Sequence, residues 1–417
     1  MRLFPLLSFA AIALSFAPAH AQQPALAALQ VATDFPGGSG KVLSIDHAEQ
    51  FVRLMPTAHE GRGWVCWWYV RINNVRMGES LTVEVGDAPW ATPDRAAWSS
   101  DGQTWRQTPP GTRDGKRIRY TWRPESSIVW VAWGPPFTSA DAEIAIAEAT
   151  RQCDSAKAFE LCRTRDDRPV PGVRFVHESL KESNHAEQTA AEATPYGVWI
   201  QARQHAWESG SSWVCRGLLE WLASDEPRAA RLRSLADITI VPIMDMDSVA
   251  IGAGGKNQIP QDHNRDWTSK PHWPSVAAAM RQIEERDSAG RFDFFIDLHN
   301  PGASTKRPFF YLPPRQLTSS LRQRNLDRFL AAARQDITGP LQFTGETQES
   351  GPSYDPKWQS ISKNWVATHT QDHVVSLTLE TAWNTPHSTT EGYRTVGKQL
   401  GEAIERYLGT QPRMPAN

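Results

Sequence analysis

The sequence predicts an α/β fold, in which a mixed, mostly parallel sheet carries helices on both faces, preceded by an all-β sandwich domain. Two observations lead to this prediction. From about residue 32 to residue 136, short runs rich in Val, Trp, Tyr and Thr alternate with turn residues, which is typical of an antiparallel sandwich. Beyond Pro135 and Pro136, strand-length apolar runs alternate with helix-length amphipathic segments, and this alternation favours a buried, mostly parallel sheet.

The individual elements follow from these two patterns. The sandwich is predicted to contain strands at residues 63–72, 80–85, 117–122 and 127–133, and a helix over residues 138–150 comes next. The later part is predicted to contain strands at 197–202, 238–243, 292–298 and 374–379, and helices at 211–222, 275–286, 321–335 and 391–408. We place the sandwich domain at residues 30–136 and the α/β domain at 137–410. Because open sheets bind ligands at the carboxyl ends of their strands, we expect the chemistry there.

Composition limits the classes of function. The chain has 417 residues, 40% of them hydrophobic, which is enough for two packed cores. Its formal net charge is -2 and it has no long Lys or Arg run, so we exclude nucleic-acid binding. Eighteen Trp residues are many for this length. We assign most of them to core packing, although such rings also suit sugar or peptide contacts.

The N-terminus has the pattern of a secretory signal peptide. Arg2 is followed by a mostly apolar run over residues 3–16, and Ala19-His20-Ala21 forms an A-x-A cleavage site. A membrane anchor would need roughly 20 apolar residues, whereas Pro18 and His20 end this run early. We therefore predict a leader over residues 1–21 and a periplasmic or secreted protein that has no membrane association after cleavage.

Four cysteines remain to be placed. Cys153 and Cys162 are close in sequence, and an oxidising compartment would allow a small disulfide loop between them. Cys66 and Cys215 lie within apolar runs, and we interpret them as buried thiols because no Cys pair has metal-ligand spacing.

A histidine and a glutamate follow the strand predicted at residues 197–202. His205 and Glu208 are three residues apart, just before the next predicted helix, so both side chains can point to one metal ion. A His-x-x-Glu pair arises easily by chance among 12 His, and the pair alone leaves a structural role open.

His299 strengthens the metal interpretation. It ends the apolar strand of FFIDLHNPG, before the chain breaks at Pro301-Gly302. Two imidazoles and one carboxylate are a zinc set that leaves a coordination position open for water. A strand-end histidine in the core is the alternative for His299 alone. We predict one Zn²⁺ held by His205, Glu208 and His299.

Two further segments carry polar residues that suit hydrolysis. Glu380 ends the apolar strand in VVSLTLETAWN, and a carboxylate there can act as the general base, although a strand-end salt bridge is the alternative. The loop QDHNRDW contains Asn264 and Arg265. An Arg fork with a neighbouring Asn can bind a substrate carboxylate, whereas the simplest alternative is a solvated charged loop.

As a set, these motifs resemble the zinc carboxypeptidases, specifically the branch typified by the cytosolic carboxypeptidases with an N-terminal β-sandwich. The first domain carries the similar stretches DFPGGSGKV, CWWYVRI, AAWSSDGQTWRQ and VWVAWGPPF. The second carries HAWESGSSWV, VPIMDMDSV, DHNRDW, FFIDLHNPG and LTLETAW in the family's order. The resemblance covers nearly the whole chain after the leader. It implies a zinc carboxypeptidase-like catalytic domain acting on a peptide-like substrate with a free C-terminal carboxylate.

The resemblance also implies roles for single residues. Glu380 would activate the water, Asn264 and Arg265 would grip the terminal carboxylate, and Asp262 would orient the first zinc histidine. The family carries an Arg for the oxyanion upstream of the Asn-Arg pair. This chain has GAGGKNQIPQ there, where Lys256 is the only cation and cannot reproduce a bidentate fork. Tyr354 is the candidate for the family's substrate-capping Tyr.

Other departures and alternatives complete the prediction. MDMDSV differs from the family's commoner Asn-Pro-Asp-Gly form, and we interpret its Asp247 as a structural residue at a turn. GGSGKV does not meet the spacing of a phosphate-binding loop, and no G-x-S-x-G elbow is present. A metallocarboxypeptidase is therefore the leading hypothesis. A deacylase or cell-wall peptide hydrolase of the same fold, and a non-catalytic peptide- or glycan-binding protein, are the alternatives.

Overall fold

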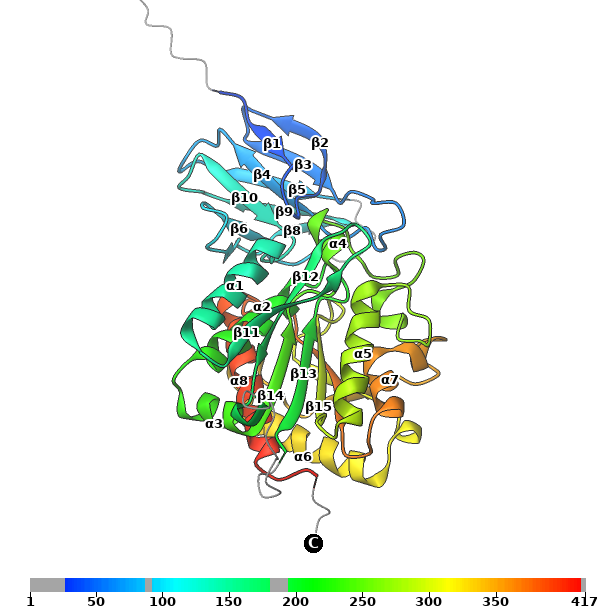
Figure 1. Cartoon of the computed structure of the whole chain (residues 1–417). Helices are drawn as coiled ribbons and strands as arrows, with labels where there is room; N and C mark the ends of the chain where they lie inside the picture. The colour runs from blue at the N-terminus through cyan, green and yellow to red at the C-terminus, as the bar shows by residue number, and fades with distance from the viewer. Residues whose placement is uncertain (1–26, 87–91, 181–193, 414–417) are drawn as a thin grey trace, which may run out of the picture.

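The computed structural model describes residues 27–86, 92–180 and 194–413. The predicted leader over residues 1–21 lies outside the described residues. Within the described part of the chain, no helix is both long enough and apolar enough to cross a bilayer. The chain forms a two-sheet β domain followed by an α/β domain built on one eight-stranded sheet (Figure 1).

The first domain is a sandwich of two five-stranded sheets, ordered β1-β4-β10-β6-β7 and β2-β3-β5-β9-β8. Its strands are β1 Gln30–Ala32, β2 Lys41–Asp46, β3 Phe51–Met55, β4 Tyr69–Asn73, β5 Leu81–Val85, β6 Ala97–Ser99, β7 Arg106–Gln107, β8 Thr112–Asp114, β9 Arg117–Trp122 and β10 Ile128–Ala132. The alternation of buried and exposed residues along β9 is the pattern expected of a sheet with one solvated face.

One predicted strand of the sandwich is too long. Residues 63–72 were expected to be extended throughout, but the strand begins only at Tyr69. The backbone N–H of Trp64 instead donates to the carbonyl of Lys256, 2.9 Å away in the other domain. Residues 63–68 therefore form a loop before the strand, and this loop is tied to the other domain through Trp64.

The α/β domain contains a sheet ordered β11-β12-β14-β13-β15-β18-β16-β17. Its strands are β11 Ala156–Arg163, β12 Pro169–Phe175, β13 Tyr196–Ala202, β14 Ala236–Val241, β15 Phe294–His299, β16 Phe309–Leu312, β17 Thr347–Glu349 and β18 Val375–Glu380. The four central strands β14, β13, β15 and β18 are parallel, which confirms the mixed, mostly parallel sheet. The antiparallel hairpin β11–β12, the strand β16 and the edge strand β17 were not predicted.

Helices cover both faces of this sheet. The helices are α1 Ser139–Gln152, α2 Ser209–Ala223, α3 Pro227–Leu235, α4 Met246–Ala250, α5 Pro274–Ser288, α6 Ser320–Asp336, α7 Ser362–His369 and α8 Thr390–Leu408. Figure 1 shows α1, α2, α3 and α8 on one side of the sheet and α5 and α7 on the other. Local sequence signals fix where two of these helices begin. Thr138 and Asp141 form a capping box at the N-terminus of α1, and Pro274 is the first residue of α5.

Two expectations about single residues need correction. Cys153 and Cys162 are both free thiols. Cys153 caps α1 and Cys162 lies near the far end of β11, which places it about 20 Å along an extended strand, whereas a disulfide needs Cα atoms closer than about 7 Å. Asp247 lies in the short helix α4 rather than at a turn. It is nevertheless structural, because it accepts from Thr164 Oγ1 at 2.7 Å and from Arg168 Nη1 at 3.0 Å.

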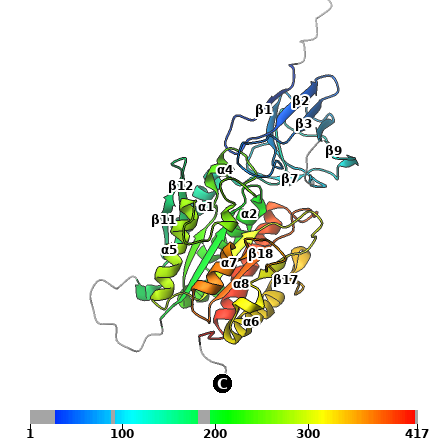
Figure 2. The ribbon, with the colours of Figure 1, turned by 90° about the vertical axis from the view of Figure 1, so that its right-hand side faces the viewer.

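The sandwich is fixed to one end of the α/β domain, as both ribbon views show (Figure 2). Backbone N–H groups donate across the boundary from Gly37 to the Ala250 carbonyl at 2.9 Å and from Gly255 to the Arg62 carbonyl at 2.9 Å. The Asp94 N–H donates to Asn384 Oδ1 at 2.8 Å. Because Asn384 follows β18, the sandwich lies over the carboxyl ends of the parallel strands.

Candidate metal and catalytic site

Three elements bring the predicted metal ligands together. His205 follows β13, His299 is the last residue of β15, and β13 and β15 are neighbours in the sheet. Glu208 occupies the N-cap of α2 but makes no capping hydrogen bond with its side chain. Its carboxylate is therefore available to the two histidines.

The donor atoms converge on one point. His205 Nδ1 lies 2.9 Å from Glu208 Oε1, and His299 Nδ1 lies 2.7 Å from Glu208 Oε2. The three residues are buried, and their ligand atoms all lie within 4.8 Å of one another. Two imidazole nitrogens and a carboxylate at this spacing fit a catalytic zinc ion, because the set has only three protein ligands.

The outward nitrogens of both histidines face carboxylates. His205 Nε2 lies 3.1 Å from Asp262 Oδ1, at the position implied by the resemblance. His299 Nε2 lies 2.8 Å from Asp297 Oδ2. Such contacts fix the ring orientation and raise the basicity of the ligand. We did not anticipate Asp297, although a carboxylate two residues before His299 on the same face of a buried strand was a readable signal.

Charges within the metal cluster shift the pKa values of its side chains. Burial by itself disfavours the ionised Glu208 carboxylate, but the charges of His205 and His299 outweigh it and lower the pKa of Glu208. Burial also disfavours the charged form of His299, but Asp297 and Glu208 raise its pKa well above the usual value. The Glu208 carboxylate is therefore held ionised at neutral pH, as a cation-binding site requires.

Glu380 lies beside the cluster on β18. The register of β15 and β18 places it directly opposite His299. Its side chain is 9% exposed, and its Oε2 atom has no hydrogen-bond partner among the described residues. Burial, reinforced by the charge of Glu208, raises the pKa of Glu380 to about 7. A buried carboxylate without a partner that titrates near neutrality is suited to accept a proton.

Asn264 and Arg265 lie in the short 3-10 helix η2, His263–Arg265, between β14 and α5. Asn264 Nδ2 lies 3.2 Å from His299 Nε2, and its Oδ1 accepts the Ser362 N–H at 3.0 Å. Arg265 is buried, with Nε 2.9 Å from Asp355 Oδ2 and Nη1 donating to the Asn264 carbonyl at 2.8 Å. These contacts fix the guanidinium close to the metal cluster.

Two tyrosines and a lysine surround this guanidinium. The Arg265 Cζ atom lies 5.6 Å from the ring centroid of Tyr354, which is 44% exposed. Tyr354 packs on Tyr311 with ring centroids 5.1 Å apart. Lys363 at the start of α7 places Nζ 5.4 Å from the Tyr311 ring. The sequence offered no signal for Lys363, because α7 and the strand carrying Tyr311 were not predicted.

Lys256 lies beside the Nε2 atom of His205. Its Nζ atom is 3.4 Å from Asp262 Oδ2 and 3.5 Å from His205 Nε2. The same residue lines the cavity above the cluster. Its ammonium is thus a cation at the cavity wall whose charge is shared with Asp262.

A cavity of about 590 Å³ opens over this site. Its wall includes His205, Glu208 and Glu380, and the sandwich contributes Trp64, Cys66 and Trp133, while Lys256, Tyr354, Tyr311, Trp207, Trp383 and residues 300–305 complete most of the remainder. This volume is within the usual range for a small-ligand or peptide site.

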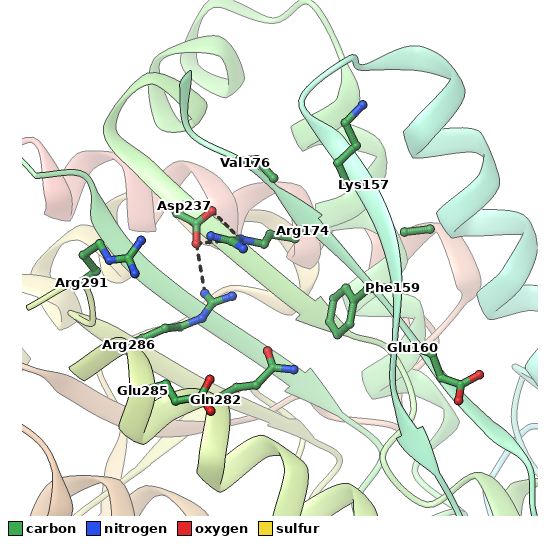
Figure 3. A pocket seen from close by; sticks show the side chains of 11 residues that line it. Lys157, Phe159, Glu160, Arg174, Val176, Asp237, Gln282, Glu285, Arg286 and Arg291 are labelled. Atoms are coloured by element: carbon green, nitrogen blue, oxygen red, sulfur yellow. Dashed lines mark hydrogen bonds and ion pairs between the residues drawn. The ribbon is translucent and has the colours of Figure 1, made fainter. Parts of the chain in front are cut away.

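A second cavity of about 580 Å³ lies between β11, β12, β14 and α5 (Figure 3). There Arg174 Nε lies 2.8 Å from Asp237 Oδ1, and Arg286 Nη1 lies 3.2 Å from Asp237 Oδ2. Asp237 is near the start of β14, at the opposite end of the strand from the metal cluster. Asp237 is thus engaged in structural ion pairs at this second cavity. We therefore place the chemistry in the first cavity, which contains the metal cluster.

Comparison with known proteins agrees with this geometry. Residues 31–133 match the family described as cytosolic carboxypeptidase N-terminal domain, and residues 145–408 match the family described as zinc carboxypeptidase. An uncharacterized protein of Zymomonas mobilis is 26% identical over 285 residues, which cover 66% of this chain and 68% of that protein. Cytosolic carboxypeptidase 4 of Mus musculus is 35% identical over 154 residues, which cover 36% of this chain but only 13% of the mouse protein.

The solved structures give the same fold. A metallo-carboxypeptidase from Burkholderia cenocepacia superposes with a TM-score of 0.77 at 22% identity, covering 92% of this chain and 100% of that one. The zinc carboxypeptidase match spans more than half of the present sequence, and the His-Glu-His donor set is intact. The chain therefore belongs to the zinc carboxypeptidase family.

Proposed function

We propose that this protein is a zinc-dependent carboxypeptidase that hydrolyses the C-terminal amide bond of a peptide-like substrate. The observation that carries this proposal is the position of Glu380, a buried carboxylate with an unpartnered oxygen, directly opposite His299 of the donor set. A binding protein without catalysis would have no use for that arrangement, since an unsatisfied buried oxygen destabilises the fold.

The residues divide the reaction between them. His205, Glu208 and His299 would hold one zinc ion, which acts as a Lewis acid and makes water a stronger acid when it is bound. Glu380 takes the proton of the attacking water and then gives it to the leaving amine as the C–N bond breaks. Burial makes this exchange feasible near neutral pH, because it raises the pKa of Glu380 to about 7.

Two cations near the metal cluster would position the substrate. Arg265 would bind the terminal carboxylate through its fork, held in orientation by Asp355 and by the Asn264 carbonyl. Tyr354 packs over that guanidinium and would cover the bound residue. Lys256 lines the cavity and would supply one point charge to the developing oxyanion instead of a fork.

Lys363 favours an acidic C-terminal residue. Its ammonium is buried beside Tyr311, which lines the cavity, and no hydrogen bond or ion pair engages it within the described residues. A buried cation without an anion is destabilising, and a substrate carboxylate would neutralise it. We therefore propose that peptides ending in Glu or Asp are preferred over those ending in Leu.

The proposal is tested by metal analysis together with peptide hydrolysis. Purified protein is expected to carry one zinc per chain and to release the last residue of free-acid peptides, but not of the same peptides with an amidated C-terminus. Cleavage of amidated peptides would favour a deacylase of the same fold. Cleavage confined to cell-wall peptides would favour the cell-wall peptide hydrolase. Absence of both zinc and turnover would favour the binding protein.

Substitution of Arg265 separates binding of the carboxylate from chemistry. Arg265→Met is expected to raise KM for free-acid peptides about 30-fold, because one charge-assisted hydrogen-bonded pair is lost. Steady-state kinetics on paired acid and amide substrates measure the effect. Arg315→Met, which removes an exposed guanidinium that does not line the cavity, is the matched control. An unchanged KM in Arg265→Met would assign the terminal carboxylate to another group.

Substitution of Lys363 is expected to stabilise the protein. Burial and the nearby charge of Arg265 lower the pKa of Lys363 to about 7. Between that value and its normal pKa the unfolded chain binds more protons, so this residue weakens the fold at neutral pH and the penalty fades as the pH rises to about 10. Lys363→Met should raise the unfolding free energy at pH 7 by about 4 kcal/mol.

Denaturant unfolding of wild type and Lys363→Met at pH 7 and pH 10 measures this difference. The difference in unfolding free energy between the two proteins should be smaller at pH 10 than at pH 7. The same variant should lose the preference for a C-terminal Glu over Leu. A variant that is less stable than wild type at both pH values would contradict the interpretation of an unpaired buried charge.

Export remains a proposal from the N-terminal sequence. Residues 1–21 have the signal-peptide pattern described above. Fractionation of cells that express the full chain, followed by N-terminal sequencing of the mature protein, is expected to find Gln22 as the first residue outside the cytoplasm. Retention of Met1 in a cytoplasmic fraction would contradict it.

A further inference from the structure

The sandwich domain forms part of the wall of the catalytic cavity. Trp64, Cys66 and Trp133 belong to the sandwich and line the same cavity as His205 and Glu208. The cavity is therefore closed on one side by a different domain from the one that carries the donor set. This arrangement implies that the sandwich contacts any substrate that fills the cavity.

The wall at this boundary is aromatic. Trp133 of the sandwich packs on Trp383 with ring centroids 4.2 Å apart, and on Trp207 at 5.0 Å. Trp64 stacks on Trp207 at 6.4 Å with an interplanar angle of 27°. We refer to Trp64, Trp133, Trp207 and Trp383 as the tryptophan wall. Two members come from each domain, and Trp207 lies between the ligands His205 and Glu208 in sequence.

Tight backbone packing sets the position of this wall. The Trp64 N–H donates to the Lys256 carbonyl at 2.9 Å, and the Ile259 N–H donates to the Gly61 carbonyl at 2.7 Å. Gly63 has a φ of +82°, and a Cβ atom there would lie 2.1 Å from the Lys256 carbonyl oxygen. On the other side, a Cβ atom on Gly254 would lie 2.0 Å from the Trp64 carbonyl oxygen. Only glycine allows the two segments this close approach.

The placement of a bound peptide follows from the groups that line the cavity. The cavity is lined by Tyr311 and Tyr354, by the tryptophan wall, and by Glu208 and Glu380. Tyr354 packs against Arg265. A peptide whose terminal carboxylate is bound by Arg265 places its scissile bond at the metal cluster. The residues that precede that bond also lie inside the cavity, where the tryptophan wall is available to contact them.

We propose that the tryptophan wall is a subsite for the penultimate residue of the substrate, and that it selects an apolar or aromatic side chain there. The proposal rests on the carboxypeptidase function proposed above. Large aromatic faces offer contact area and favourable edge-to-face packing to an aromatic side chain. They offer a penultimate Gly almost nothing, so the selectivity arises from one side chain of the substrate.

The experiment compares two acylated dipeptides with the same acidic C-terminal residue, one with a penultimate Phe and the other with a penultimate Gly. Wild type is expected to have at least a tenfold higher kcat/KM for the Phe substrate, mainly through KM. Trp64→Ala is expected to lower kcat/KM for the Phe substrate about tenfold and to change that for the Gly substrate less than twofold.

Two glycine variants test whether the interdomain contact positions the wall. Gly63→Ala introduces the collision with Lys256 and is expected to reduce the Phe preference at least as much as Trp64→Ala. Gly78→Ala is the matched control, because Gly78 also has a positive φ, +76°, in the sandwich but has no atom within 4 Å of the added Cβ. It should retain the wild-type preference. Near-ultraviolet circular dichroism checks that each variant is folded.

The outcomes separate the two proposals. If the protein hydrolyses neither dipeptide and no other free-acid peptide, the proposed carboxypeptidase function itself is overturned. Hydrolysis of both at equal kcat/KM, or an equal loss for both in Trp64→Ala, overturns the subsite alone. A preference that depends on Trp64 but appears only with a sugar-bearing peptide also overturns the proposal and assigns the wall to a glycan. If Gly63→Ala folds and keeps the full preference for Phe, the claim that the interdomain contact positions the tryptophan wall is overturned.

Discussion

Glu380→Gln is expected to lower kcat about 10³-fold while the zinc content stays at one per chain. The substitution keeps the shape of the side chain but removes its capacity to accept a proton, and general-base catalysis is worth about 10² to 10⁴ in rate. Because Glu380 is not among the three residues whose ligand atoms converge, metal retention should be unaffected. Stopped assays of peptide hydrolysis and metal analysis of the same preparation measure both quantities.

The pH profile of the wild type should report the same group. Burial raises the pKa of Glu380 to about 7, and a bound divalent cation would lower it from there. Only the ionised carboxylate can accept the proton, so kcat/KM should fall as the pH decreases through this pKa. Glu380→Gln should have lost this acidic limb. Glu349→Gln, an exposed carboxylate on β17, is the control and should keep it.

Retention of more than a tenth of the wild-type kcat by Glu380→Gln would assign the base to another group. Restoration of activity by Glu380→Asp above the level of the Gln variant would support the assignment, because a shorter carboxylate still accepts a proton.

His299→Ala is expected to abolish both zinc binding and hydrolysis. The substitution removes one of three donors. It leaves Asp297 as a buried carboxylate without its imidazole partner and leaves Glu208 with His205 alone. Asp297→Asn leaves the donor intact and should weaken zinc affinity by about 10- to 100-fold, the usual cost of losing the carboxylate behind a ligating histidine. Competition with a zinc chelator measures both affinities.

His47→Ala is the control for His299→Ala, because His47 is an exposed histidine of the sandwich. It should bind zinc and hydrolyse peptides as wild type does. A His299→Ala protein that retains stoichiometric zinc would exclude His299 as a ligand. An Asp297→Asn protein with wild-type zinc affinity would show that Asp297 does not support the metal ligand. Its role would then be structural, through hydrogen bonds such as those with Gln204 and Ser362.

Periodicity in the sequence was sufficient for the parallel core of the fold. The strand predicted at residues 197–202 is β13, Tyr196–Ala202, and the helix predicted at 391–408 is α8, Thr390–Leu408. Continuous apolar runs and strong amphipathic stripes depend only on local sequence and burial, so they are readable without coordinates. The strands β16 and β17 were missed because they have only four and three residues, too few for a clear pattern, and β17 is fully exposed.

The sequence by itself determined which side chains follow the apolar strands: His205, His299 and Glu380 stand at strand ends, where parallel strands present their carboxyl termini on one edge. Only the tertiary structure decided how the rest of the site is built. The carboxylate of Asp297 behind His299, the buried ammonium of Lys363 beneath Tyr311, and the Trp64 side chain supplied by another domain all depend on contacts between segments far apart in the chain. Such contacts are set by packing, and local patterns in a sequence do not encode them directly.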